Sequence, residues 1–189
     1  MRGRGADAPP LPARDRGAVP LLQLRRRDAR AVKVERAGAE ELGDVVEVLS
    51  EAAAWLRSRG IEQWPSPFPA DWVAPSIERG ETYLVRENDA VAGTITLRWE
   101  DPAFWGEQPP VAGYVHGIAV RREFAGLGPE LLAWADEQVR AAGRGLLRLD
   151  CRTDNAELRR YYERHGFRYC GDATVHDFRT SLYERRCSP

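Results

Sequence analysis

Apolar residues recur along this chain with two different periods, one typical of strands and one typical of helices. From residue 31 they first alternate with polar residues and then recur every three or four positions until Gly60, which predicts a strand followed by a helix. Two further alternating stretches flank Asn88-Asp89, a pair that favours a hairpin turn. The front half is therefore predicted to contain a helix over 42–60, a short helix near 72–78, and strands over 31–36, 82–87 and 91–99.

The second half of the chain alternates strands with helices. Apolar stripes with helical spacing follow residues 129 and 155, and Gly143 and Gly166 stop the two patterns. An antiparallel front half joined to a strand–helix–strand back half predicts an α/β (α+β) fold with a mixed, mostly antiparallel central sheet flanked by helices. After a proline-rich loop over 102–110, the predicted elements are helices over 129–142 and 155–165 and strands over 113–120, 146–151, 167–171 and 181–185.

The first 30 residues differ in composition from the rest. They carry eight arginines against three aspartates, and four prolines among glycines and alanines. Such a segment buries too little apolar surface to offset the entropy of ordering. We therefore expect residues 1–30 to form a disordered Arg/Pro-rich tail and residues 31–189 to form one folded domain. A tail that binds nucleic acid or an acidic partner is the alternative interpretation, and a passive leader is the favoured one.

Charge and cysteine usage narrow the class of protein. The 189 residues have a formal net charge of −1, which argues against a domain that binds nucleic acid or a membrane surface. No apolar run approaches the roughly 18 residues of a membrane span. The three cysteines lack Cys-x-x-Cys spacing and fit reduced thiols in a cytoplasmic protein, and no metal site is predicted.

A glycine-containing turn joins a predicted strand to a predicted helix. The run VRREFAGLGP (residues 120–129) combines two arginines, Gly126 and Gly128 with a proline suited to the first turn of a helix. Glycines let backbone N–H groups approach a ligand closely, and a helix N-terminus favours anions. The pattern indicates an anion site, although an ordinary turn fits the same residues.

A second motif lies in the next predicted helix. The run NAELRRYYERHGF (residues 155–167) places Asn155 at the helix start, Tyr162 seven residues later and a Gly-Phe pair at the end. Asn155 is a suitable helix cap. Taken alone, the segment is typical of a capped helix with a core tyrosine.

In this order and spacing, the two motifs and the predicted elements of residues 31–186 resemble the GNAT superfamily of acyl-CoA-dependent N-acyltransferases, in its bacterial form. The resemblance implies an N-acetyltransferase that moves an acetyl or other short acyl group from acetyl-CoA to a primary amine through a tetrahedral intermediate. It also implies that Tyr162 protonates the departing thiolate. The residues that it implies bind the cofactor are Ile118, Ala119, Val120, Arg121, Arg122, Gly126, Gly128 and Asn155.

The glycine turn departs from the family pattern. Counted back from Leu131-Leu132, the loop is two residues shorter than is usual, and Ala125 stands where the family has an arginine or glutamine. A shorter loop offers fewer backbone N–H groups to the pyrophosphate of the cofactor. A non-catalytic acyl-CoA-binding module is therefore an alternative interpretation of the chain.

The acceptor side of such an enzyme needs a base, because an alkyl amine with a pKa near 10.4 must lose a proton before it attacks a thioester. His116 shares a strand face with Ile118 and, with Glu100, is a candidate for that role. Gly117 predicts a bulge that would free backbone N–H groups near Ile118 to stabilise the oxyanion. A structural role for His116 fits the sequence equally well.

Aromatic residues are concentrated in the loops that would border the acceptor. Loop aromatics beside acidic groups can hold a cationic amine by cation–π attraction, although singly they are more often loop anchors. We expect a small-molecule amine as the partner, and a monomer or homodimer. The acceptor residues expected on this basis are Trp64, Trp99, Trp105 and Glu107, with Phe68, Trp72, Asp101 and Phe104 nearby.

A dinucleotide-binding oxidoreductase is the competing class. Gly126-x-Gly128 before a helix, with Asp150 at the end of the next strand, imitates the spacing of NAD(P) sites. However, Leu131 stands where the third glycine of that motif belongs, and the apolar strand ends five residues before the turn. Both features oppose this interpretation.

Overall fold

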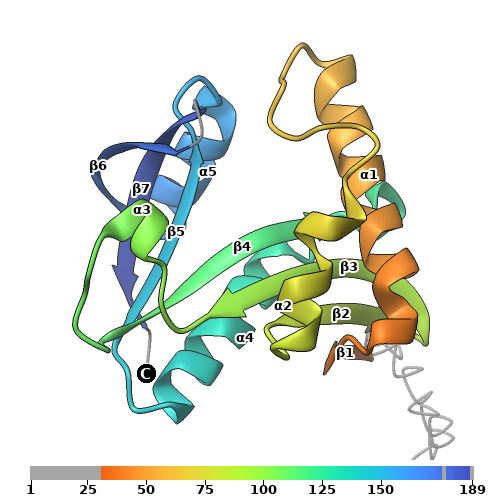
Figure 1. Ribbon diagram of the computed structural model, residues 1–189, viewed down its shortest axis with the longest axis horizontal. Helices are drawn as coiled ribbons and strands as arrows, with labels where there is room; N and C mark the ends of the chain where they lie inside the picture. Colours follow the sequence, from red (N-terminus) through yellow and green to blue (C-terminus); the bar gives the residue numbers. More distant parts are fainter. Residues whose placement is uncertain (1–30, 176–177, 188–189) are drawn as a thin grey trace, which may run out of the picture. The chain divides into compact units, whose positions relative to one another are not determined.

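A mixed β-sheet forms the centre of the protein in the computed structural model, which describes residues 31–175 and 178–187. Within these residues the sheet has seven strands in the order β1-β2-β3-β4-β5-β7-β6 (Figure 1). All neighbouring strands are antiparallel except β4 and β5, which are parallel. The predicted mixed, mostly antiparallel sheet is therefore confirmed, whereas the expectation for residues 1–30 lies outside the described residues.

The order of strands and helices also matches the order that the sequence predicts. The strands are β1 (Val32–Arg36), β2 (Thr82–Glu87), β3 (Ala90–Arg98), β4 (Ala112–Val120), β5 (Leu146–Arg152), β6 (Arg168–Val175) and β7 (Phe178–Arg186). The α-helices are α1 (Leu42–Ser58), α2 (Ala74–Glu78), α3 (Pro102–Trp105), α4 (Gly128–Ala141) and α5 (Ala156–Arg164). Short 3-10 turns cover Ala39–Glu41, Ala70–Trp72 and Arg122–Phe124.

Three elements differ from their predicted extents. Residues 102–110 are not wholly a loop, because α3 begins at Pro102, where a missing N–H costs nothing. Strands β6 and β7 extend toward each other beyond the predicted 167–171 and 181–185. Among the added residues, Asp172, Thr174 and Arg179 are polar and exposed, so hydrophobic patterning marks these extensions only weakly.

Helices cover both faces of the sheet. Adjacent residues of β2 point to opposite faces, so Leu84 packs with α1 and α2 while Val85 packs with α4 and the core beneath it. Helix α1 contributes Val45, Val48 and Leu49, the apolar stripe that its sequence predicts. The hairpin between β2 and β3 turns at two residues with positive φ, as the Asn-Asp pair predicts.

Strands β4 and β5 pair only over the first half of β4. Their register runs from Ala112 opposite Leu146 to Val115 opposite Leu149 and then stops. Gly117 has φ +53°, and the pairing of β4 with β3 shifts register at this point, so the predicted bulge is confirmed. Beyond it the two strands diverge, and α1 and α5 stand on opposite sides of the opening (Figure 1).

Candidate active site

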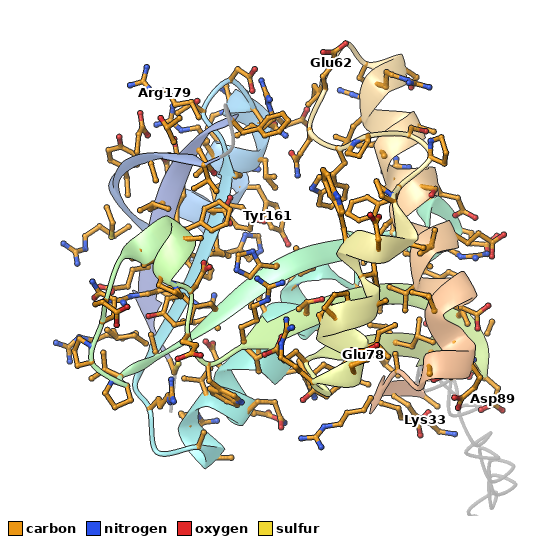
Figure 2. All side chains as sticks on the ribbon, viewed as in Figure 1. Lys33, Glu62, Glu78, Asp89, Tyr161 and Arg179 are labelled. Atoms are coloured by element: carbon orange, nitrogen blue, oxygen red, sulfur yellow. The ribbon has the colours of Figure 1, made fainter. Side chains whose placement is uncertain are left out.

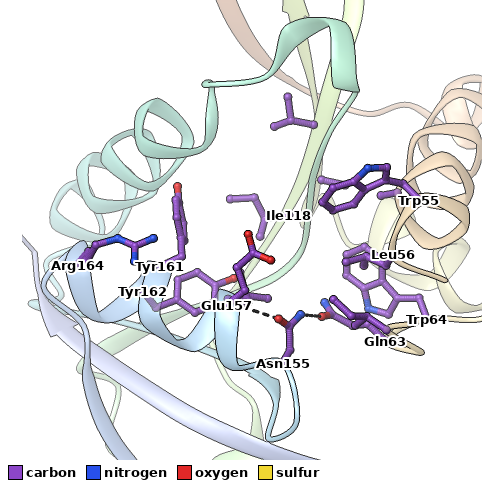
Figure 3. A pocket seen from close by; sticks show the side chains of 15 residues that line it. Trp55, Leu56, Gln63, Trp64, Ile118, Asn155, Glu157, Tyr161, Tyr162 and Arg164 are labelled. Atoms are coloured by element: carbon purple, nitrogen blue, oxygen red, sulfur yellow. Dashed lines mark hydrogen bonds between the residues drawn. The ribbon is translucent and has the colours of Figure 1, made fainter. Parts of the chain in front are cut away.

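Two cavities lie where β4 and β5 diverge. The first has a volume of about 290 Å³ and lies between α1, β4 and α5 (Figure 3). It contains four of the eight residues predicted to bind the cofactor, namely Ile118, Ala119, Val120 and Asn155. Its other lining residues are Ala52, Trp55, Leu56, Ile61, Gln63, Trp64, Glu157, Leu158, Tyr161, Tyr162 and Arg164.

Asn155 connects the start of α5 to the segment that follows α1. Its Oδ1 accepts a hydrogen bond from the Leu158 backbone N–H at 3.1 Å, which is the helix cap that the sequence predicts. Its Nδ2 donates to Oε1 of Gln63 at 2.9 Å (Figure 3). The buried amide therefore holds one wall of the cavity against the other, and Gln63 is a site residue that sequence patterning did not identify.

The other four predicted cofactor residues, Arg121, Arg122, Gly126 and Gly128, do not line this cavity. The Arg121 guanidinium is held by two carboxylates of α1, Glu47 at 2.7 Å and Glu51 at 3.5 Å. The Arg122 guanidinium lies 4.3 Å from the centre of the Trp55 ring, which does line the cavity.

Tyr161 approaches the start of α4 closely. A Cβ atom placed on Gly128 would lie 2.6 Å from the Tyr161 hydroxyl, so a larger residue there requires the phenol to shift. The ring lies on the side of α5 that faces the opening (Figure 2) and lines the first cavity together with Arg164. Neither residue was predicted to be part of the site.

The second cavity has a volume of about 550 Å³ and lies on the other side of the same opening. Gln63, Trp64 and Tyr162 line both cavities. The remaining lining residues are Pro65, Trp72, Phe104, Val115, His116, Gly117, Asp150, Cys151, Arg152, Val175, Phe178 and Thr180.

His116 lies between two carboxylates in this second cavity. Its Nε2 is 3.1 Å from Oδ2 of Asp101, and its Nδ1 is 3.6 Å from Oδ1 of Asp150. Asp101 is buried, with 4% of its side chain exposed, and lies directly before α3. A carboxylate therefore lies near each ring nitrogen of His116, the predicted base candidate. The ring centres of Phe104 and His116 are 5.6 Å apart.

Burial raises the pKa of the Asp150 carboxyl above its ordinary value, and the nearby His116 and the Thr180 hydroxyl oppose the shift. The Thr180 hydroxyl donates to Oδ2 of Asp150 at 2.6 Å, which fixes the carboxyl from the β7 side. The raised pKa makes this carboxyl more basic than an ordinary aspartate, which marks it as a candidate functional group beside the imidazole.

Tyr162 lies at the junction of the two cavities. The side chain is buried, and burial raises the pKa of its phenol above the ordinary value of 10. Its ring is held by Tyr161, Phe167 and Tyr183. Its hydroxyl forms no hydrogen bond with any residue in the described part of the chain. The phenol therefore keeps its proton and has a donor available for a bound group.

Four residues expected on the acceptor side lie elsewhere. Glu100 and Glu107 are exposed and line neither cavity. The Trp99 ring lies under the Arg144 guanidinium at 5.0 Å, and the Trp105 ring lies under that of Arg148 at 4.5 Å. Trp105 also packs edge-on against Tyr114 of β4, whereas Phe104 packs against His116. Of the expected acceptor residues, Trp64 does line the cavity, together with Trp72 and Phe104.

Two absences concern only the described residues. Within 31–175 and 178–187, no group of three or more His, Cys, Asp or Glu side chains is arranged to hold a metal ion. No helix in that part of the chain has the length and apolar character needed to cross a membrane.

Comparison with known proteins identifies the class. Residues 48–167 match the model of the acetyltransferase (GNAT) family. YesJ of Bacillus subtilis, described as an uncharacterized N-acetyltransferase, is 30% identical over 143 residues, which are 70% of this chain and 79% of that protein. A crystal structure of a GNAT family acetyltransferase from Listeria monocytogenes has a TM-score of 0.68 at 26% identity and covers 82% of this chain and 94% of its own.

A further likeness is in fold alone. The aminoglycoside acetyltransferase AAC(6')-Ib in complex with coenzyme A has a TM-score of 0.64 at 19% identity, covering 82% of this chain and 95% of its own.

The mixed sheet with its diverging parallel strands defines an acyl-CoA N-acyltransferase fold, and the chain belongs to the acetyltransferase (GNAT) family. This finding overturns the oxidoreductase alternative. Asp150, which imitated the ribose-binding acid of a dinucleotide site, faces His116 in the second cavity instead.

Proposed function

We propose that the protein transfers the acetyl group of acetyl-CoA to a primary amine of a small molecule by direct attack. The observation that carries this proposal is the position of Tyr162. Its side chain lines both cavities, and its hydroxyl has no hydrogen-bond partner among the described residues. One cavity is lined by the β4 residues that the family resemblance assigns to the cofactor. The other contains a histidine held by two carboxylates.

The residues of the first cavity fit an acyl-CoA. Ile118, Ala119 and Val120 belong to the part of β4 that β5 no longer pairs, so backbone groups on that edge can bind a pantetheine amide chain. Arg164 lines the cavity, and Arg122 lies over Trp55 beside it, which provides positive charge for phosphates. Tyr161 at Gly128 adds a hydroxyl donor beside the shortened loop.

On the acceptor side, His116 would remove a proton from the bound ammonium so that the amine nitrogen can attack the thioester carbonyl. Asp101 and Asp150 would orient the imidazole and stabilise its charged form. Backbone N–H groups near the Gly117 bulge would stabilise the oxyanion of the tetrahedral intermediate.

The proposed reaction balances in atoms and protons. The N–C bond forms, and the C–S bond of the thioester then breaks. The ammonium loses two protons in all. One leaves through His116 to solvent. The Tyr162 phenol gives its proton to the departing thiolate, and the second proton of the nitrogen restores the phenol. The products are an N-acetyl amine and coenzyme A with a free thiol.

The decisive experiment measures thiol release from acetyl-CoA with a panel of primary amines, together with calorimetry of acetyl-CoA binding. Binding with acceptor-dependent thiol release would support the proposal. Binding without turnover on any amine would favour a non-catalytic acyl-CoA-binding module, the alternative that the shortened loop suggests.

We also propose a cytoplasmic location, and a monomer or homodimer as the active form. The location is supported by the three cysteines, which are all free thiols. Size-exclusion chromatography with light scattering would determine the oligomeric state.

A further inference from the structure

Aromatic and apolar side chains line most of the second cavity. Trp64 and Trp72 approach it from the segment after α1, Phe104 from α3 and Phe178 from β7. Val115, Val175 and Pro65 add further apolar surface. A volume of about 550 Å³ accommodates a molecule larger than a simple alkyl amine.

Two of these aromatics are unusually exposed for their size. Trp72 is 56% exposed and Phe178 is 48% exposed, although both line the cavity. Trp72 is held edge-on by Phe68 at 5.8 Å, and Phe68 is held in turn by Trp64 at 5.9 Å. The protein therefore maintains exposed aromatic surface at this cavity, which solvent alone does not favour.

The described lining of this cavity carries few charges. Among the described lining residues, Asp150 is the one carboxylate and Arg152 is the one arginine or lysine. The Arg152 guanidinium is already paired with both oxygens of Asp154, at 3.0 and 2.6 Å. Within the described lining, one carboxyl is therefore available to an ammonium group beside His116, and each additional positive charge on an acceptor would lie against aromatic surface with no anionic partner among these residues.

We propose that this cavity selects a monoamine with a flat apolar body, such as an arylalkyl amine, and discriminates against polycationic acceptors. The amine lies beside His116 and Asp150, and the body packs against Trp72 and Phe178. This inference rests on the proposed function for its reaction, but the binding preference that it states can be measured without turnover.

The test compares 2-phenylethylamine with n-butylamine, spermidine and kanamycin at saturating acetyl-CoA. We expect kcat/KM for 2-phenylethylamine to exceed that for each of the others by about tenfold or more, because its flat ring buries more apolar surface against the aromatics than a butyl chain or a polar body does. Trp72→Ala and Phe178→Ala should each raise KM for 2-phenylethylamine with little change in kcat, and leave n-butylamine nearly unaffected. Tyr169→Ala is the matched control, because Tyr169 is 45% exposed but lines neither cavity.

Calorimetry of the same amines with the CoA-bound protein separates this inference from the proposed function. If 2-phenylethylamine binds, Trp72→Ala weakens it and no amine is acetylated, the acceptor preference is supported and the proposed function fails. If amines are acetylated with spermidine or kanamycin preferred, or with the Trp72 and Phe178 variants unchanged in selectivity, the acceptor preference is overturned and the function stands. Absence of both binding and turnover for 2-phenylethylamine also overturns it.

Discussion

His116 and Asp150 face each other across the opening between β4 and β5, with Nδ1 and Oδ1 3.6 Å apart. Each residue directly follows the last residue of its strand in the β4–β5 pairing, Val115 on β4 and Leu149 on β5. The register of the β4–β5 pairing therefore brings a histidine and a carboxyl together at the base of the acceptor cavity, although 34 positions separate them in the sequence.

The first prediction concerns His116 as the base. His116→Gln keeps a polar side chain between Asp101 and Asp150 but removes the titratable nitrogen. We expect kcat/KM for amine acetylation to fall by about 100-fold or more, which is typical of a lost general base. Steady-state kinetics over a range of pH would measure it.

Glu100→Gln is the matched control for His116→Gln. Glu100 was a candidate base in the sequence, but its side chain is exposed and lines neither cavity. Activity should therefore stay near that of the wild type. A large loss with Glu100→Gln and none with His116→Gln would reverse the assignment.

The second prediction concerns the cost of burying Asp150. Folding raises the pKa of this carboxyl, so the folded state favours its protonated form. Near and below its ordinary pKa of 3.8, wild type and Asp150→Asn both carry a neutral group and should differ little in stability. As the pH rises through the raised pKa, the wild type must bury a charge that the variant lacks.

Asp150→Asn should therefore have the higher melting temperature at neutral pH, with the difference shrinking as the pH falls toward 4. The same variant should lose activity, because His116 loses the carboxyl beside its Nδ1. Thermal melts at several pH values would measure the first effect. A variant that is less stable than wild type at neutral pH would show that the Asp150–His116 contact outweighs the cost of burial.

Sequence patterning gave the order of elements but not the composition of the acceptor site. The Asn155 cap, the Gly117 bulge and the hairpin at Asn88-Asp89 are local, so spacing and residue type predict them. The contact of His116 with Asp150 depends on the register between two strands that a helix separates. Hydrophobic periodicity does not encode that register. The sequence singled out Asp150 only through its spacing from Gly128, which resembles that of an NAD(P) site.

The aromatic residues of the acceptor loops illustrate a second limit. Trp99, Trp105 and Phe104 lie within seven residues and look equivalent in the sequence. Arg144 and Arg148, about 40 residues later in the sequence, lie over the two tryptophans. The phenylalanine lines the cavity instead. Long-range cation–π contacts therefore decided which aromatic is part of the site.

The third prediction concerns the close contact between Gly128 and Tyr161. Gly128→Ala would place a Cβ atom 2.6 Å from the phenol oxygen, so the ring or the start of α4 must move. Because the phenol oxygen is the far end of a half-buried side chain, we expect a loss of stability below the roughly 1–3 kcal/mol that overpacking a core costs. Because Tyr161 lines the first cavity, acetyl-CoA affinity measured by calorimetry should fall as well.

Removing the clash tests its origin. Tyr161→Phe deletes the hydroxyl, so Gly128→Ala combined with Tyr161→Phe should recover part of the stability that Gly128→Ala alone loses. Gly145→Ala is the control, since a Cβ atom there meets nothing within 4 Å. Equal losses in the single and double variants would show that the backbone at Gly128, and not the phenol, sets the requirement for glycine.

The fourth prediction concerns residues 1–30, whose Arg/Pro-rich composition argues against a packed structure. A chain that begins at Ala31 should keep the melting temperature and the kcat/KM of the full chain. Circular dichroism melts and thiol-release kinetics would compare the two. Loss of either property on truncation would mean that the tail contributes to the fold or to the site.

The last prediction concerns Tyr162 as the general acid. Tyr162→Phe removes only the hydroxyl, which forms no hydrogen bond within the described residues, so the ring packing and the melting temperature should be preserved. The kcat should fall by about 100-fold, within the usual range for a lost proton donor. Acetyl-CoA affinity should stay near normal, because the lost interaction is made mainly in the transition state.

The dependence of kcat on pH tests the acid role separately, because a purely structural role of Tyr162 would not change it. Burial raises the pKa of the Tyr162 phenol above its ordinary value of 10, so the wild type should keep its donor through pH 10. Tyr162→Phe should therefore lower kcat by the same factor at every pH up to that value. Tyr161→Phe is the control on the neighbouring ring, because its half-buried hydroxyl lies beside Gly128, away from the junction of the cavities. If Tyr161→Phe lowers kcat and Tyr162→Phe does not, the acid is Tyr161; if neither does, water protonates the thiolate.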